Sequence, residues 1–176
     1  MKFIEIPLSG AYIIEIEPAF DERGFFARTF CKNEFKNKGL NPNIAQQSIS
    51  YNKRKGTIRG MHYQNAPYQE VKIVSCIKGE IFDVIVDLRK DSPTYCQWFS
   101  ILLSDENYKM LYIPKWFAHG FQTLKDDTIV LYQMSEFYYS EYQRGVRWDD
   151  PAFKIKWPFP PSVISERDKG YPLYGA

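Results

Sequence analysis

The feature that most constrains the fold is a succession of short β-prone runs, each closed by turn residues. Runs rich in Ile, Val, Tyr and Phe and bounded by Gly, Pro, Asn or Asp span residues 11–17, 25–30, 44–50, 57–63, 71–77, 81–88, 98–103, 108–113 and 128–137. Lys78 and Gly79 separate two of these runs, as in a tight hairpin. Helix is expected only at residues 33–38 and in the turn opened by residues 104–106. Many strands and few helices predict an all-β protein, either a closed barrel or a sandwich.

The length and composition of the chain limit the number of domains and the kinds of partner that we expect. The chain has 176 residues, of which 44% are apolar and 25% charged, so we expect one soluble domain over residues 1–176. Its 17% of aromatic residues suit a pleated core and can also stack on rings of a ligand. The net charge is only +2 and no basic run is present, so no nucleic-acid partner is expected. A pI near 8.3 still allows a local cationic pocket for one anionic ligand.

Features of the chain that bear on its compartment predict a cytoplasmic protein. No stretch is long and apolar enough to span a bilayer, and Glu5 falls where a signal peptide needs its apolar core. Cys31, Cys76 and Cys96 are odd in number and lack paired spacing, which indicates neither a disulfide framework nor a zinc knuckle. We therefore expect no membrane partner and a reducing environment.

Histidine is scarce, with His62 and His119 as the two examples. A lone histidine in a strand is more often structural than catalytic, but both lie in segments dense with Arg, Tyr, Gln and Gly, which favours a functional role. A metal-binding barrel needs three or four His or carboxylate ligands around the ion. Gln64 stands two residues after His62, where a second histidine would be needed, and no carboxylate lies beside either histidine. No metal is expected.

Strand alternation indicates which polar side chains face the interior. Across residues 57–64 it places His62 and Arg59 on opposite faces, so a shared pocket requires a break in register, for which Gly60 is suited. Lys72 shares a face with apolar Val74 and Cys76, as an interior lysine would.

Tyr132 similarly shares a face with Val130 and Met134 and is expected to point into the interior. The alternatives are a surface lysine at 72, with its ammonium extended to water, and an ordinary core tyrosine at 132.

Motifs spread over nearly the whole chain resemble those of the dTDP-4-dehydrorhamnose 3,5-epimerase family, and they occur in the family's order. The matching segments are DERGFF (21–26), GTIRGMHYQ (56–64), KIV (72–74), GEIFDV (79–84), DSPT (91–94), IP through HGF (113–121), WDDP (148–151), IKWP (155–158) and SERD (165–168). The resemblance implies a cupin, or jelly-roll, barrel with short peripheral helices. It also implies an isomerase that needs no cofactor, and a homodimer with the N-terminal strand as the exchange element.

The resemblance also implies catalytic roles. A ketone at C4 of a sugar acidifies the C–H bonds at C3 and C5, and epimerisation removes a proton and returns one to the opposite face. His62 would be the base, because imidazole titrates near neutral pH, and Asp168 would hold its tautomer. Tyr132 would be the opposing acid. Lys72 would stabilise the enolate oxygen.

Binding roles follow from the same resemblance. Arg23, Arg59, Gln46 and His119 would hold the diphosphate and the sugar, and Tyr138 would stack on the nucleobase. Arg167 is expected in the same substrate site.

Three further substrate-site positions depart from the family pattern. Arg28 and Gln143 stand where the family usually has Glu, and Ser48 replaces an Asn in an alignment shifted by one residue. Arg28 and Gln143 make the pocket more cationic, and we hypothesise that these departures alter the preferred nucleobase or sugar. The alternative is that Arg28 points to solvent or pairs with a surface acid.

Several functions remain open at this stage. The leading one is 3,5-epimerisation, at C3, C5 or both, of a nucleotide-linked 4-keto-6-deoxy sugar in deoxysugar and polysaccharide biosynthesis. Alternatives are an epimerase for a CDP- or GDP-linked sugar, a 3,4-ketoisomerase on the same fold, and a non-catalytic sugar-binding cupin. An opposed Tyr132 argues against the ketoisomerase, which moves protons on one face. A His–Asp pair with Tyr and Lys argues against a module that only binds.

Overall fold

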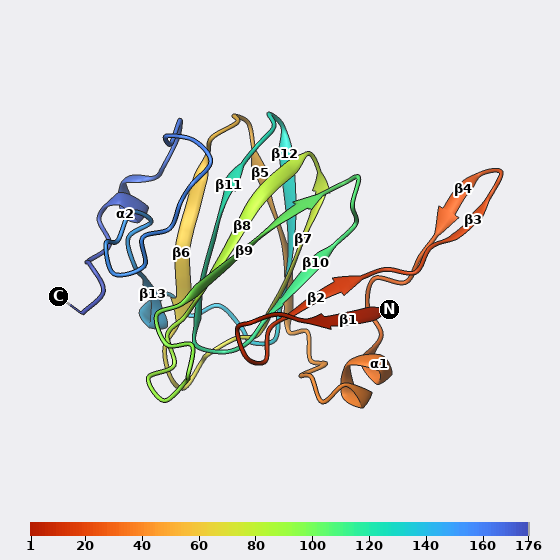
Figure 1. Ribbon diagram of the computed structural model, residues 1–176, viewed down its shortest axis with the longest axis horizontal. Coiled ribbons are helices and arrows are strands. Elements are labelled where there is room, and N and C mark those ends of the chain that lie inside the picture. Colours follow the sequence, from red (N-terminus) through yellow and green to blue (C-terminus); the bar gives the residue numbers. More distant parts are fainter. Residues whose placement is uncertain (176) are drawn as a thin grey trace.

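The computed structural model describes residues 1–175, and its strands form two antiparallel sheets packed face to face (Figure 1). The first sheet has the order β1-β2-β10-β7-β12-β5, with β1 (Lys2–Glu5), β2 (Tyr12–Glu15), β5 (Gln46–Asn52), β7 (Lys72–Lys78), β10 (Met110–Ile113) and β12 (Thr128–Met134). The second has the order β13-β6-β11-β8-β9, with β6 (Ile58–Gln64), β8 (Glu80–Asp87), β9 (Trp98–Ser104), β11 (Phe117–Thr123) and β13 (Gln143–Gly145). All strand pairs within them are antiparallel. The predicted all-β class is confirmed.

The core lies between the two sheets. One apolar face comes from Val74, Leu111 and Val130 of the first sheet, and the other includes Ile85 and Phe121 of the second. Each of these side chains is fully buried, and burial of such a side chain contributes about 1.5–3 kcal/mol. Together they fix the two sheets as rigid walls.

Short helices and a long C-terminal segment cover the outer faces. The helices are α1 (Lys32–Asn37), the 3-10 helix η1 (Ser140–Tyr142) and α2 (Glu166–Lys169). Phe35 of α1 is fully buried against the first sheet. Val146 and Phe153 pack on the second sheet, so β11 is buried on both faces. No helix within residues 1–175 is both long and apolar enough to cross a membrane.

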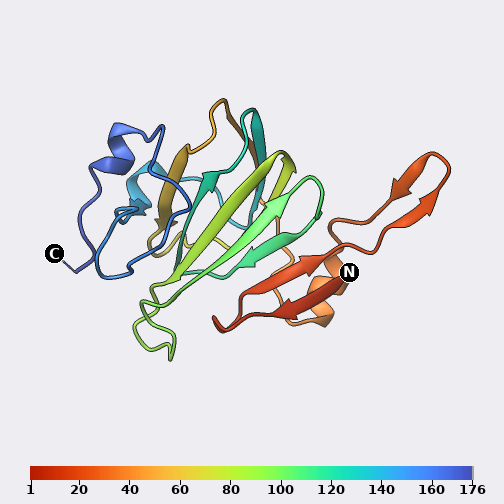
Figure 2. The ribbon, with the colours of Figure 1, turned by 45° about the horizontal axis from the view of Figure 1, so that its top comes forward.

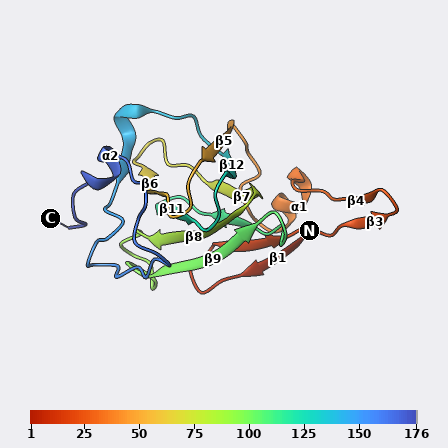
Figure 3. The ribbon, with the colours of Figure 1, turned by 90° about the horizontal axis from the view of Figure 1, so that it is seen from above.

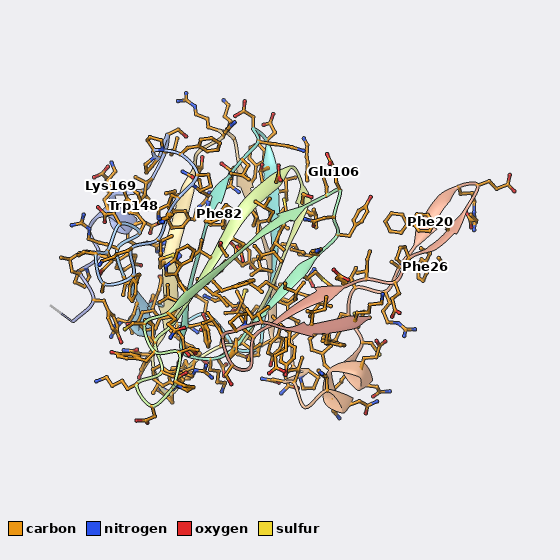
Figure 4. The ribbon with its side chains drawn as sticks, viewed as in Figure 1. Phe20, Phe26, Phe82, Glu106, Trp148 and Lys169 are labelled. Atoms are coloured by element: carbon orange, nitrogen blue, oxygen red, sulfur yellow. The ribbon has the colours of Figure 1, made fainter. Side chains whose placement is uncertain are left out.

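A two-stranded arm, β3 (Ala19–Asp21) with β4 (Gly24–Phe26), projects from the body on the side opposite α2 (Figures 1 and 2). It stands away from both sheets in the view from above as well (Figure 3). Phe20 and Phe26 on this arm are 75% and 82% exposed, and Figure 4 shows them apart from the rest of the molecule. An isolated two-stranded hairpin is marginally stable at best in water.

Most of the predicted strands are present, with ends shifted by a few residues, and helix 33–38 corresponds to α1. The prediction for residues 25–30 was too long, because β4 ends at Phe26. Strands β1, β3, β11 and β13 and helix α2 were not predicted. The helix expected from residues 104–106 is wrong, because this segment is a turn closed by Asn107 and the Ser104 hydroxyl.

The hairpin predicted at Lys78 and Gly79 is also wrong. The turn is as tight as expected, with Gly79 at φ +82°, but β7 and β8 belong to different sheets and do not pair. Added at Gly79, a Cβ would lie 2.5 Å from the Thr128 hydroxyl. The glycine therefore lets the chain cross from one sheet to the other at close quarters.

The expected break in register at Gly60 is confirmed. In the β6–β11 pairing His62 is opposite His119, whereas Arg59 is opposite Phe121, so β6 carries one extra residue between Arg59 and His62. The backbones of the two strands approach closely here, because a Cβ at Gly60 would lie 2.5 Å from the Gly120 Cα. Only glycine fits there, and its bulge allows both Arg59 and His62 to serve one cavity.

Candidate active site

A cavity of about 290 Å³ opens between the two sheets, beside the start of β7 and the end of β12. Both sheets and the loops that follow β12 contribute to its wall. The lining residues are Gln46, Ser48, Ser50, Arg59, His62, Tyr63, Gln64, Glu70, Lys72, His119, Tyr132, Met134, Glu136, Tyr138, Gln143 and Arg167.

His62 on β6 is paired with Asp168 on α2. Its Nε2 lies 2.8 Å from Asp168 Oδ1, and the other carboxylate oxygen accepts from the Gly60 amide at 3.2 Å. Ser165 caps α2 by accepting from the Asp168 amide, which fixes this carboxylate behind the histidine. The Asp168 side chain is only 3% exposed, whereas that of His62 is 23% exposed and faces the cavity.

The environment of this pair favours a neutral imidazole beside an ionised carboxylate. Burial lowers the pKa of His62, and the hydrogen bond that His62 donates to Asp168 opposes this only in part. Burial alone would raise the pKa of Asp168, but its hydrogen bonds with His62 and Gly60 bring the pKa below its usual value. A histidine that is neutral at pH 7 can accept a proton.

Tyr132 reaches the same cavity from β12 of the opposite sheet. On the same strand face, Val130 is buried in the core and Met134 lines the cavity. The predicted inward orientation of Tyr132 is therefore confirmed. Burial, with a smaller contribution from the charge of Asp83, raises the pKa of Tyr132. The phenol therefore stays protonated at neutral pH and is a proton donor.

A second His–carboxylate pair lies deeper in the cavity. His119 Nε2 is 2.7 Å from Asp83 Oδ1, and the His119 ring meets the Tyr132 ring edge-on at 5.9 Å between centroids. Asp83 is fully buried, and burial raises the pKa of its carboxyl even though His119 and Lys72 oppose the shift. Sequence reasoning missed Asp83, although its place between Ile81 and Ile85 on an apolar strand face was a usable signal.

Lys72 projects inward from the start of β7, as predicted, and its side chain is 12% exposed. The ammonium lies 3.0 Å from Glu70 Oε1 and donates to the backbone carbonyl of His62 at 3.2 Å. Glu70 was also missed, although the spacing of two residues from Lys72 places both side chains on one face of an extended strand.

The mouth of the cavity carries cationic, amide and aromatic groups. Gln46 accepts from the Tyr138 amide, and Gln143 accepts from both the Tyr138 hydroxyl and Arg167. Arg59 is held by the Asn52 side chain at 2.7 Å. The Tyr138 residue is 56% exposed, so its ring is available to a ligand.

Two predicted binding residues do not line this cavity. Arg23, whose side chain is 88% exposed, lies on the projecting arm and pairs with Asp21. Arg28 follows the arm and pairs with Glu34 at 3.0 Å. Within one chain, therefore, Arg28 pairs with a surface acid and does not enter the pocket, as the alternative prediction stated.

Tyr171 near the end of the chain packs against His62. Its ring meets the His62 ring at 5.7 Å between centroids, and it fills the space beside Gly145, where a Cβ would lie 2.4 Å from the ring. The C-terminal segment thereby restricts the position of His62. No group of three or more His, Cys, Asp and Glu side chains within residues 1–175 has the spacing of a metal site.

Comparison with known proteins identifies the family of this chain. The family model described as dTDP-4-dehydrorhamnose 3,5-epimerase matches residues 5–175. The chain belongs to this family. A protein of that name from Methanothermobacter thermautotrophicus is 46% identical over 173 residues, covering 97% of this chain and 92% of that protein.

Solved structures agree with this assignment. The dTDP-4-dehydrorhamnose 3,5-epimerase from Bacillus anthracis, crystallised with TDP and PPi bound, superposes with a TM-score of 0.95 at 41% identity and 98% coverage of both chains. The dTDP-6-deoxy-D-glucose-3,5-epimerase from Legionella pneumophila, in complex with dTDP-4-keto-L-rhamnose, gives 0.92 at 35% identity, covering 98% of this chain and 92% of that one. The predicted family, the cupin-type all-β fold and the isomerase class are confirmed.

Proposed function

We propose that this member of the 3,5-epimerase family inverts C3 and C5 of a nucleotide-linked 4-keto-6-deoxy sugar such as dTDP-4-dehydro-6-deoxy-D-glucose. One observation carries the proposal. A neutral His62 backed by Asp168 and a protonated Tyr132 enter one cavity from opposite sheets. A base and an acid on opposing walls suit removal of a proton from one face of a sugar and delivery to the other.

The chemistry follows from these positions. His62 takes the proton from C3 or C5, and the electron pair of the broken C–H bond moves into the C4 carbonyl to form an enolate. Lys72 stabilises the enolate oxygen, and Asp168 stabilises the imidazolium. Tyr132 then protonates the carbon from the other face, and exchange with water returns the tyrosinate and the imidazolium to their starting states.

The mouth of the cavity suits the nucleotide. Arg59 and Arg167 supply guanidinium groups for a diphosphate, and the exposed ring of Tyr138 offers a surface for the base. A 3,4-ketoisomerase would move protons on one face, so groups from two opposing sheets favour epimerisation. A module that only binds sugar would not require the His62–Asp168 pair.

Incubation with dTDP-4-dehydro-6-deoxy-D-glucose in deuterium oxide tests this function. Deuterium should enter C3 and C5, and His62→Asn should slow its entry by several orders of magnitude. Binding of dTDP to the variant, measured by calorimetry, controls for its folding. Full exchange in His62→Asn would exclude this histidine as the base.

We further propose that the protein acts as a homodimer in which the β3–β4 arm packs on a second copy. The exposed Phe20 and Phe26 support this, because a hairpin of six strand residues cannot bury them alone. Arg23 at the tip of the arm, which is remote from the cavity of its own chain, would then bind the diphosphate in the partner's cavity.

Mixed dimers test the shared site. Arg23→Ala and His62→Asn should each be nearly inactive alone, but their heterodimer contains one site with both residues intact. Random association at equal amounts should restore about one quarter of wild-type activity. No recovery in co-expressed mixtures, with dimers present by light scattering, would show that Arg23 does not act across subunits.

A further inference from the structure

The cavity wall holds a carboxylate oxygen that no protein group satisfies. The Glu70 side chain is 7% exposed and lines the cavity, with Oε1 held by Lys72. Its Oε2 is buried and has no hydrogen-bond partner within residues 1–175. A buried carboxylate oxygen without a donor from the protein costs free energy, which a donor on a ligand would offset.

The neighbouring Lys72 ammonium has the opposite property, a hydrogen-bond donor that no protein group within residues 1–175 accepts. Lys72 has three N–H donors, of which one faces Glu70 Oε1 and one faces the His62 carbonyl. The third is left for a ligand. Lys72 and Glu70 therefore offer one donor and one acceptor side by side in the cavity.

A 4-keto sugar has the matching pair of groups. The C4 carbonyl oxygen can only accept a hydrogen bond, and the hydroxyl on the adjacent C3 can donate one. With the keto oxygen on Lys72, as the proposed function requires, the neighbouring hydroxyl is the group placed to reach Glu70.

We propose that Glu70 is a specificity-determining residue whose Oε2 accepts a hydrogen bond from the C3 hydroxyl of the sugar; this inference rests on the proposed function. A sugar without that hydroxyl would leave a buried carboxylate oxygen unpaired, so the site selects against 3-deoxy sugars. The competing explanation is that Glu70 only positions Lys72, in which case every substrate depends on it equally.

Two substrates separate these explanations. Deuterium entry at C5 is measured for dTDP-4-dehydro-6-deoxy-D-glucose and its 3-deoxy analogue, both of which carry the C5 proton. The wild-type protein should prefer the hydroxylated sugar in kcat/KM by roughly 10- to 100-fold, as expected for a hydrogen bond to a charged group. Glu70→Ala also removes the partner of Lys72, so both sugars should be slowed, but the hydroxylated sugar should be slowed more and most of the preference should be lost.

Two further variants sharpen the comparison. Glu70→Gln keeps the shape and one acceptor oxygen, so its preference should be intermediate. Glu136→Gln alters another carboxylate of the cavity, one that accepts from the Phe137 amide, and should leave the ratio between the two sugars unchanged. An equal fall for both sugars in the Glu70 variants would overturn the inference. Absence of exchange with either sugar in the wild-type protein would instead overturn the proposed function.

Discussion

Asp168→Asn removes one charge beside His62, the proposed base, while keeping the shape of the side chain. The affected contact is the 2.8 Å hydrogen bond between His62 Nε2 and Asp168 Oδ1, and the carboxylate is too buried for water to replace it. A hydrogen bond to a charged group contributes about 1.5–3 kcal/mol. If the full amount stabilises the imidazolium that forms during proton removal, kcat/KM falls roughly 10- to 150-fold.

The same substitution should also shift the pH dependence of kcat/KM in a predictable direction. In the proposed mechanism the neutral form of His62 is the active base, so kcat/KM should rise with pH through the pKa of His62, which burial holds below the ordinary value of 6.5. Asp168 opposes that lowering through its hydrogen bond and its charge. Its removal should move the acid limb to still lower pH even though the plateau falls.

The measurement is kcat/KM for epimerisation from pH 4.5 to 9 in the wild-type protein and the variant. Asp150→Asn is a matched control, because Asp150 is equally buried but accepts only from Ala152 and Tyr174 amides through its side chain. The control should lose stability without moving the acid limb. A limb that moves to higher pH in Asp168→Asn, or a plateau that does not fall, would refute the proposed role of the carboxylate.

Tyr132→Phe should lower net inversion by roughly 10²–10⁴-fold, while deuterium entry, which needs only His62, falls less; a parallel loss of both would point to another acid. Exhaustive treatment with a chelator should leave activity unchanged, and loss with recovery on added zinc or iron would contradict the expected independence from metals. Turnover of dTDP-, CDP- and GDP-linked 4-keto-6-deoxy sugars should favour the dTDP form. Because Arg28 pairs with Glu34, Arg28→Glu should change this preference little; a reversal would place Arg28 in a substrate site.

The fold was largely predictable because alternation of apolar residues is a local property of each strand. β11 escaped because it is buried on both faces and contains Ala118 and Gly120, which weaken the strand pattern. The crossing at Gly79 escaped for a different reason. A glycine turn between two strands looks the same whether the strands pair or separate into two sheets, and only packing decides between these outcomes.

For the site, alternation predicted that Lys72 and Tyr132 face inward, and the resemblance supplied His62 and Asp168. Residues 62 and 168 are far apart in the sequence, so sequence spacing alone could not predict that their side chains pair. Arg23 shows a further limit, since the sequence did not reveal that this side chain lies on a projecting arm and outside the cavity of its own chain. Glu70 was available from its spacing to Lys72, but its free oxygen is a property of the folded cavity alone.

Tyr171, which packs against Gly145 and His62, belongs to a segment that is held less firmly than the sheets. The sheets that carry Lys72 and Tyr132 are held by a continuous apolar core, whereas the segment that carries Asp168 and Tyr171 contains one helix of four residues. Local opening of such a segment requires far less free energy than separation of the sheets. The histidine would then lose its carboxylate and its aromatic neighbour together, while the cavity walls stayed intact. If the His62–Asp168 pair acts as proposed, activity would then be lost and regained with this local opening, without unfolding of the sheets.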